Sequence, residues 1–233
     1  MTPLGSGELG SILEAIGPFK WAVLVSLLAV VSGLSIGLYT AVTGLYPKAD
    51  VAGGEYATVY SVGQRLFPIT IPSTQGAVSV PIEGKVNIIV PQYVRCPDIC
   101  HYETLIMKSL MIKLFQEDSL DDVVFVTVEV DPWRGSLEEA GMYIKESTAS
   151  LDFTPPWIWV GGDMESLETL YKQLGLSVQL DSSTGLIVHT AGFYIVDRNG
   201  VLLYYVKVED EGWKNPGKVA DVLEYVVNDA LSK

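Results

Sequence analysis

VNIIVPQYVRCPDIC, from Val86 to Cys100, is the stretch that decides the fold of this chain. Its β-branched run over residues 86–90 predicts an interior strand, and apolar residues recur at helical spacing from Tyr102 to Phe115. The only two cysteines of the chain, Cys96 and Cys100, therefore fall where a strand runs into a helix. We expect the chemistry of this protein to lie in that loop.

Strands and helices alternate after this unit. We predict buried strands over Val123–Val130 and Trp157–Val160, and helices over Leu137–Ile144 and Leu167–Leu174, the second of which Gly175 ends. Such alternation predicts parallel strands joined by helical crossovers.

Two hairpins flank the alternating region. Phe67–Ile71 and Val78–Val80 read as short strands around a turn. Phe193–Val196 and Val201–Tyr205 read as a second hairpin, whose Asn199-Gly200 tolerates positive φ. With a closing helix over Lys218–Leu231, this order predicts an α/β, thioredoxin-like fold with an N-terminal hairpin extension.

The N-terminal part of the chain predicts a membrane anchor. No charged residue lies between Lys20 and Lys48, and Trp21 to Val42 is long enough for a hydrocarbon core of ~30 Å. A cleaved signal peptide has a shorter apolar region that starts earlier. We therefore expect a fold preceded by one transmembrane helix, with a tail at 1–20, an anchor at 21–45, a linker at 46–58 and a thioredoxin-like domain at 59–233.

Charge and cysteine content indicate the compartment and the partners. The formal net charge of −13 argues strongly against binding nucleic acid. A domain whose only cysteines form one close pair suits an oxidising compartment. We expect a single-pass protein of the cell membrane with its C-terminal domain outside the cytoplasm.

The two cysteines are spaced for shared chemistry. At positions i and i+4, Cys96 and Cys100 present both sulfurs on one side of a first helical turn, and Pro97 suits an early helical position. The helix N-terminus and Arg95 favour thiolates. Such a pair closes a disulfide or chelates one soft metal ion; two ordinary core cysteines are the alternative.

A metal site needs a third ligand, and the chain has two histidines. His101 points ~100° away from Cys100 on a helix, whereas His189 precedes a strand whose neighbouring loop lies beside the cysteine turn in a thioredoxin fold. Packing or capping is the alternative role for His189. Two thiolates and an imidazole suit Cu(I), accept Cu(II) and could hold zinc with a water; outside the cell, copper is the first choice.

These residues together resemble a known family, Sco (SenC), over roughly Phe67 to Leu231. The resemblance is carried by Gly84-Lys85-Val86, Cys96-Pro97-Asp98-Ile99-Cys100, Val128-Glu129-Val130-Asp131-Pro132, Val188-His189-Thr190 and Asp197-Arg198-Asn199-Gly200. It implies a membrane-anchored copper chaperone that assists assembly of the CuA centre in subunit II of cytochrome c oxidase. It also implies that Cys96, Cys100 and His189 bind copper, as Cu(I) or Cu(II), and that Asp131 supports the site without coordinating.

Two positions depart from the family pattern. His101 stands where the family often has proline, and Val188 stands where it often has aspartate before the histidine. A carboxylate that orients a metal-bound histidine changes metal affinity by about 10- to 100-fold. The resemblance therefore leaves the copper affinity of this chain open.

Other functions use the same cysteines. An extracytoplasmic thiol-disulfide oxidoreductase would use Cys96 and Cys100 as a redox pair that keeps CuA-site cysteines reduced. A peroxidase would use Cys96 as the peroxidatic thiolate and Cys100 to resolve it. A purely structural membrane-tethered domain is the remaining alternative. His189 discriminates between the first two classes, because metal delivery needs it and thiol exchange does not.

Overall fold

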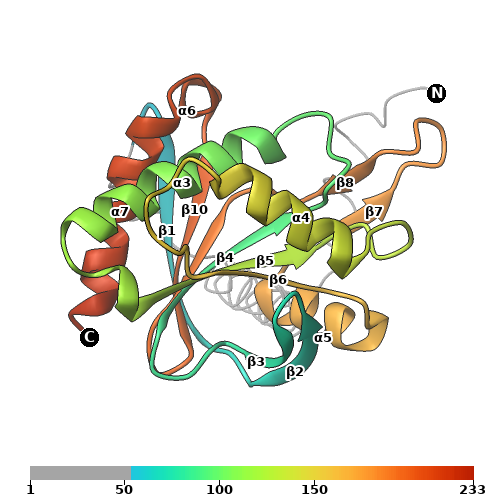
Figure 1. The fold of residues 1–233 in the computed structure, drawn as a ribbon, viewed down its shortest axis with the longest axis horizontal. Coiled ribbons are helices and arrows are strands. Elements are labelled where there is room, and N and C mark those ends of the chain that lie inside the picture. Colours follow the sequence, from blue (N-terminus) through green and yellow to red (C-terminus); the bar gives the residue numbers. More distant parts are fainter. Residues whose placement is uncertain (1–53) are drawn as a thin grey trace, which may run out of the picture. The chain divides into compact units, whose positions relative to one another are not determined.

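Three parallel strands form the centre of the domain: β4 (Val86–Gln92), β5 (Val123–Glu129) and β6 (Trp157–Val160) (Figure 1). The computed structural model describes residues 54–233. Every residue of these strands is buried, as a parallel sheet covered on both faces requires. The helices α3 (Cys100–Gln116) and α4 (Leu137–Thr148) make the connections, which confirms the predicted crossovers.

Antiparallel strands extend this centre on both sides. β9 (Phe193–Val196) pairs with β4 and continues through β10 (Val201–Val208) to β1 (Ala57–Arg65). On the other side, β2 (Ile69–Ser73) joins β6 at one residue pair and pairs along its length with β3 (Gly76–Val80). Both predicted hairpins are confirmed, and the eight strands follow the order β1-β10-β9-β4-β5-β6-β2-β3.

Several elements were not predicted. β1 begins at Ala57, within the range expected to be linker. Two short strands, β7 (Val178–Leu180) and β8 (Ile187–His189), form a separate two-stranded sheet. A 3₁₀ turn, η1 (Leu120–Asp122), and a short helix, α6 (Asp210–Lys214), complete the additions. These short elements bury few apolar residues, so hydrophobic periodicity does not reveal them.

The expected anchor at 21–45 lies outside the described residues. Within residues 54–233, no helix is both long enough and apolar enough to span a bilayer.

Two hydrophobic cores lie on opposite faces of the sheet. The helices α3, α4 and α7 (Pro216–Leu231) cover one face, and α5 (Met164–Leu174) covers the other (Figure 1). Side chains along a strand alternate between the two faces of a sheet, so β4 contributes to both cores. Ile88 packs in the first core and Ile89 in the second. Cys96 and Cys100 belong to the second core.

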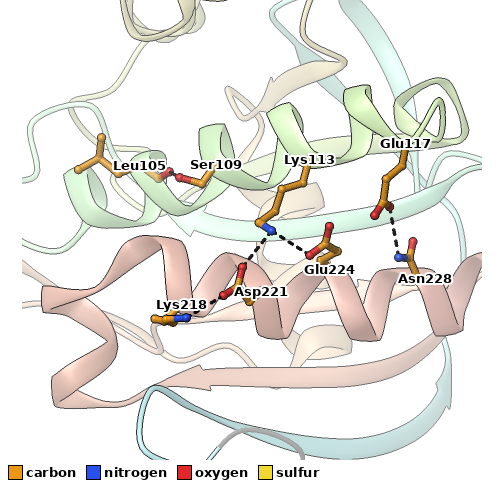
Figure 2. A network of polar contacts seen from close by, with 8 residues as sticks. All are labelled: Leu105, Ser109, Lys113, Glu117, Lys218, Asp221, Glu224 and Asn228. Carbon is orange, nitrogen blue, oxygen red and sulfur yellow. Dashed lines mark hydrogen bonds and ion pairs between the residues drawn. The ribbon is translucent and has the colours of Figure 1, made fainter.

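Polar contacts join α3 to α7 at the surface (Figure 2). The Lys113 ammonium pairs with the Asp221 carboxylate at 2.9 Å and with the Glu224 carboxylate at 3.0 Å. One turn further on, the Asn228 amide donates to Glu117 at 3.4 Å. The C-terminal half of α3 is thus fixed to α7, while its N-terminal end carries the cysteine loop.

Candidate metal centre

The two cysteines lie side by side at the start of α3. Cys96 belongs to the loop after β4, and Cys100 is the first residue of the helix. Both are free thiols and nearly buried, with exposed fractions of 5% and 3%. The two sulfurs hydrogen-bond to each other, as the spacing of four residues predicts.

This hydrogen bond makes the pair electrostatically unequal. Donation from Cys100 lowers the pKa of the Cys96 thiol to about 5 against the effect of burial, and backbone contacts of Asp98 and Cys100 add to the effect. The same hydrogen bond and burial raise the pKa of the Cys100 thiol. At neutral pH, Cys96 is therefore a thiolate and Cys100 is a thiol.

Tyr93 adds a second polar group beside Cys96. Its hydroxyl hydrogen-bonds to Cys96, which contributes to the lowered pKa of that thiol. Burial, followed by the charge on Cys96, raises the pKa of Tyr93 to about 12. The phenol thus stays protonated and donates to the thiolate, a role that the sequence did not suggest.

Gln92 holds the beginning of α3 against the sheet. This residue ends β4 and is 0% exposed. Its side-chain Nε2 donates to the Cys100 carbonyl at 3.1 Å and to the Thr104 hydroxyl at 3.4 Å. Its Oε1 accepts from the Thr127 hydroxyl of β5 at 3.3 Å. One buried amide therefore fixes the backbone of Cys100 relative to two central strands.

His189 ends β8 and faces the cysteine loop. With Tyr93 and Cys96, it lines a cavity of about 260 Å³ whose other walls are Pro97–Ile99 and Leu186–Val188. The His189 ring packs edge to face with the Tyr93 ring, with 6.2 Å between centroids. The structure thus brings together Cys96 and His189, which are far apart in the sequence.

The imidazole of His189 is suited to bind a metal. Burial lowers its pKa, so the ring is neutral at neutral pH. Its Nδ1 lies 2.9 Å from the Thr190 carbonyl, which only accepts hydrogen bonds, so Nδ1 carries the proton. Nε2 is left with a free lone pair, the usual arrangement for a metal-binding histidine.

The three predicted ligands share a neighbourhood without forming a finished cage. Across residues 54–233, no three His, Cys, Asp or Glu side chains are grouped closely enough to hold an ion. Cys96 and His189 line the cavity, whereas Cys100 does not line it and hydrogen-bonds to Cys96. Thiolate sulfur and neutral imidazole nitrogen are donors that copper prefers, and Cys100 can supply a second thiolate by losing its proton, so the residues fit the ion. Simultaneous binding by all three therefore requires their side chains to come closer together than they lie in this structure.

His101 lies away from this cavity, as its helical position predicts. It lines a different cavity together with Thr104, Lys108 and Tyr143.

Asp131 contacts neither cysteine nor His189. It follows β5, is 2% exposed, and its Oδ2 accepts from Arg134 Nε at 2.7 Å. The Nη1 of Arg134 donates in turn to the Gly185 carbonyl, in the loop between β7 and β8. Asp131 is therefore linked to the hairpin that carries His189, which fits a supporting role.

Sequence reasoning overlooked a buried acid under the cysteines. Glu103 is 0% exposed, and neither carboxyl oxygen makes a hydrogen bond of good geometry, although Gln92 and Gly192 lie nearby. Burial raises its pKa well above the ordinary value, which favours the protonated carboxyl. Its position three residues after Cys100 on a helix could have revealed this, because residues at that spacing share a face.

Comparisons with known proteins agree with the sequence resemblance. The SCO1/SenC family model matches residues 72–227. The protein SCO1 homolog 1, mitochondrial, of Arabidopsis thaliana is 28% identical over 146 residues, covering 61% of this chain and 42% of that protein. The chain thus spans less than half the length of this relative.

Solved structures share the fold. Apo Sco1 from Thermus thermophilus matches with a TM-score of 0.54 and 24% identity, covering 77% of this chain and 100% of that one. ScoI from Bradyrhizobium japonicum, solved with copper bound, matches with a TM-score of 0.51 and 24% identity, covering 71% and 98%. These likenesses support the predicted thioredoxin-like α/β fold for the described domain.

Proposed function

The chain belongs to the SCO1/SenC family, and from this premise we propose that it is an extracytoplasmic copper chaperone. It binds one copper ion as cargo through Cys96, Cys100 and His189. It assists assembly of the CuA centre in subunit II of cytochrome c oxidase, the role that the family resemblance implies. The segment at 21–45 anchors it in the cell membrane as a single span.

The observation that carries this proposal is the cavity shared by Cys96 and His189. A thiolate on one wall and a neutral imidazole on the other match the soft and borderline ligands of Cu(I). Cys100 is within hydrogen-bond distance of Cys96, so its sulfur is available to the same ion. The related ScoI from Bradyrhizobium japonicum was solved with copper bound.

The different pKa values of the two thiols suggest the order in which the ligands bind copper. Cys96 is already ionised at neutral pH and contacts the ion first. Cys100 loses its proton on binding, because thiolates and not thiols ligate metals. His189 completes the site through Nε2. Release proceeds by exchange of these ligands for thiolates and imidazoles of the acceptor. A Cys96–Cys100 disulfide offers no thiolate and blocks loading.

A thiol-disulfide oxidoreductase is the second candidate. The difference in pKa between the two thiols favours this function as well. An ionised Cys96 attacks a substrate disulfide, and Cys100 resolves the mixed disulfide. In that case the chain would keep the CuA-site cysteines of its partner reduced. Thiol exchange gives His189 no necessary role.

The test is copper binding by the full-length chain in detergent, reduced and titrated with Cu(I) against a chromophoric chelator. We expect one copper per chain, with at least tenfold weaker binding in Cys96→Ser, Cys100→Ser and His189→Ala. The preoxidised chain should take up no copper. If His189→Ala binds copper normally while the cysteines exchange disulfides rapidly with glutathione, the oxidoreductase function replaces the chaperone function.

A further inference from the structure

The side chain of Arg134 connects two segments that the sheet does not connect. Its Nε donates to Asp131 Oδ2 at 2.7 Å, and its Nη1 donates to the Gly185 carbonyl at 2.8 Å. Asp131 follows the central strand β5 and is almost fully buried. Gly185 lies in the loop between β7 and β8. One guanidinium thus ties this hairpin to the rigid centre of the domain.

Besides Arg134, the hairpin is attached through the buried Ile187, through Val178, which packs against the same core, and through a hydrogen bond between the Ile187 backbone and Tyr93. β7 and β8 pair only with each other, through three residue pairs, and a two-stranded hairpin by itself is marginally stable. Ile187 is buried, but Leu180, Leu186 and Val188 are between 43% and 60% exposed. Apolar packing therefore holds the hairpin at Ile187 and Val178, and Arg134 holds its loop.

The loop of the hairpin is internally rigid, so a bond to Gly185 restrains the whole unit. The Asp181 carboxylate accepts from the Ser183 backbone N–H at 2.9 Å and from the Thr184 hydroxyl at 2.7 Å. The Gly185 N–H donates to the Asp181 carbonyl at 2.7 Å. Gly185 adopts φ +71°, which turns the chain back and which glycine tolerates best.

We propose that Arg134 is a positioning residue for metal binding: it holds the β7–β8 hairpin so that His189 faces Cys96. This inference rests on the proposed copper function. Arg134 touches neither ligand and acts through Gly185. Its planar guanidinium serves two acceptors with two different nitrogens, whereas a lysine ammonium is a compact point charge that fits this geometry less well.

The first test needs no copper. Hydrogen exchange of the reduced, full-length apo chain in detergent should show at least tenfold faster exchange over residues 177–190 in Arg134→Ala, with β4 and β5 unchanged. Arg134→Lys should be intermediate. Arg198→Ala is the control, because Arg198 is also partly exposed and ion-paired, with Asp122 at 3.3 Å, but lies at the opposite end of β4. Unchanged exchange in the hairpin of Arg134→Ala would overturn the proposal.

The second test is a double-mutant cycle on Cu(I) affinity. We expect Arg134→Ala to weaken binding about as much as His189→Ala does, and the double variant to bind no more weakly than His189→Ala alone. If Arg134→Ala weakens Cu(I) binding by the same factor in the unaltered chain and in the His189→Ala variant, Arg134 acts on the site without His189. That result would overturn the positioning role. If His189→Ala itself leaves affinity unchanged, the proposed ligand set fails, and the hydrogen-exchange result alone then reports whether Arg134 restrains the hairpin.

Discussion

Cys96 and His189 line the same cavity, although one precedes α3 and the other ends β8. The thiolate of the first and the neutral imidazole of the second are both produced by local contacts: the Cys100 hydrogen bond and the burial of the histidine ring. The two groups are therefore in the protonation states that a soft metal needs before any metal arrives.

The first prediction concerns the reactivity of Cys96. Replacing its hydrogen-bond donor in Cys100→Ala should raise the pKa of Cys96 from about 5 toward the ordinary thiol value. Because the thiolate is the nucleophile, alkylation by iodoacetamide at pH 6 should slow by at least tenfold. Mass spectrometry of the reduced apo chain measures this. An unchanged rate at pH 6 would show that the Cys100 contact does not ionise Cys96.

The second prediction concerns pH and stability. Burial raises the pKa of Glu129 to about 7. The folded state then holds a proton that the unfolded state releases near pH 4.5, so stability declines as pH rises from about 4.5 through 7. Glu129→Gln should remove this pH-dependent loss of unfolding free energy. The loss amounts to up to about 3 kcal/mol, which corresponds to the difference between the folded and unfolded pKa values of Glu129. Urea unfolding between pH 5 and 8 measures it; an identical pH dependence in both proteins contradicts the prediction.

The third prediction concerns close packing at Gly135. A Cβ there would lie 2.7 Å from Glu129 Oε2, whose carboxylate also accepts from the Trp159 indole at 3.1 Å. Gly135→Ala should therefore destabilise the fold by about 1–3 kcal/mol. Gly217→Ala is the control, because a Cβ at that helical position meets no described atom within 4 Å. Thermal unfolding that shows equal stability of the two variants would exclude this steric clash.

The fourth prediction concerns the contact between α3 and α7. Lys113→Ala leaves Asp221 and Glu224 without their shared cation and should cost about 0.5–1 kcal/mol of unfolding free energy. The loss should shrink in 1 M salt, where charges are screened beyond ~3 Å. Lys214→Ala removes a more exposed pair with Glu211 and should change stability little. A Lys113→Ala loss that is independent of salt would indicate lost packing of the alkyl chain instead.

The central strands and the helices around them were predictable because each has a simple burial pattern. β4 and β5 read as continuous apolar runs since both faces are covered, and the inward residues of α3 recur at helical spacing. The same pattern placed Cys96 and Cys100 in the loop between strand and helix.

The parts that the sequence did not reveal depend on non-local contacts. The β7–β8 hairpin buries only Ile187 among its strand residues, so no periodic apolar pattern marks it. The bond between Arg134 and Gly185 joins segments that are distant in the chain. Nothing in the local sequence of either residue predicts that contact, and it follows only from the arrangement of the strands.

The alternation of β4 between two cores has a consequence for how this domain tolerates insertions and deletions. Adding or removing one residue within Val86–Gln92 would send Ile88 and Ile89 to each other's face, because side chains in a strand alternate with a period of two. It would also turn Gln92 away from Cys100 and reverse the direction in which the cysteine loop leaves the sheet. Natural variation in chain length should therefore be excluded from the segment before the cysteines.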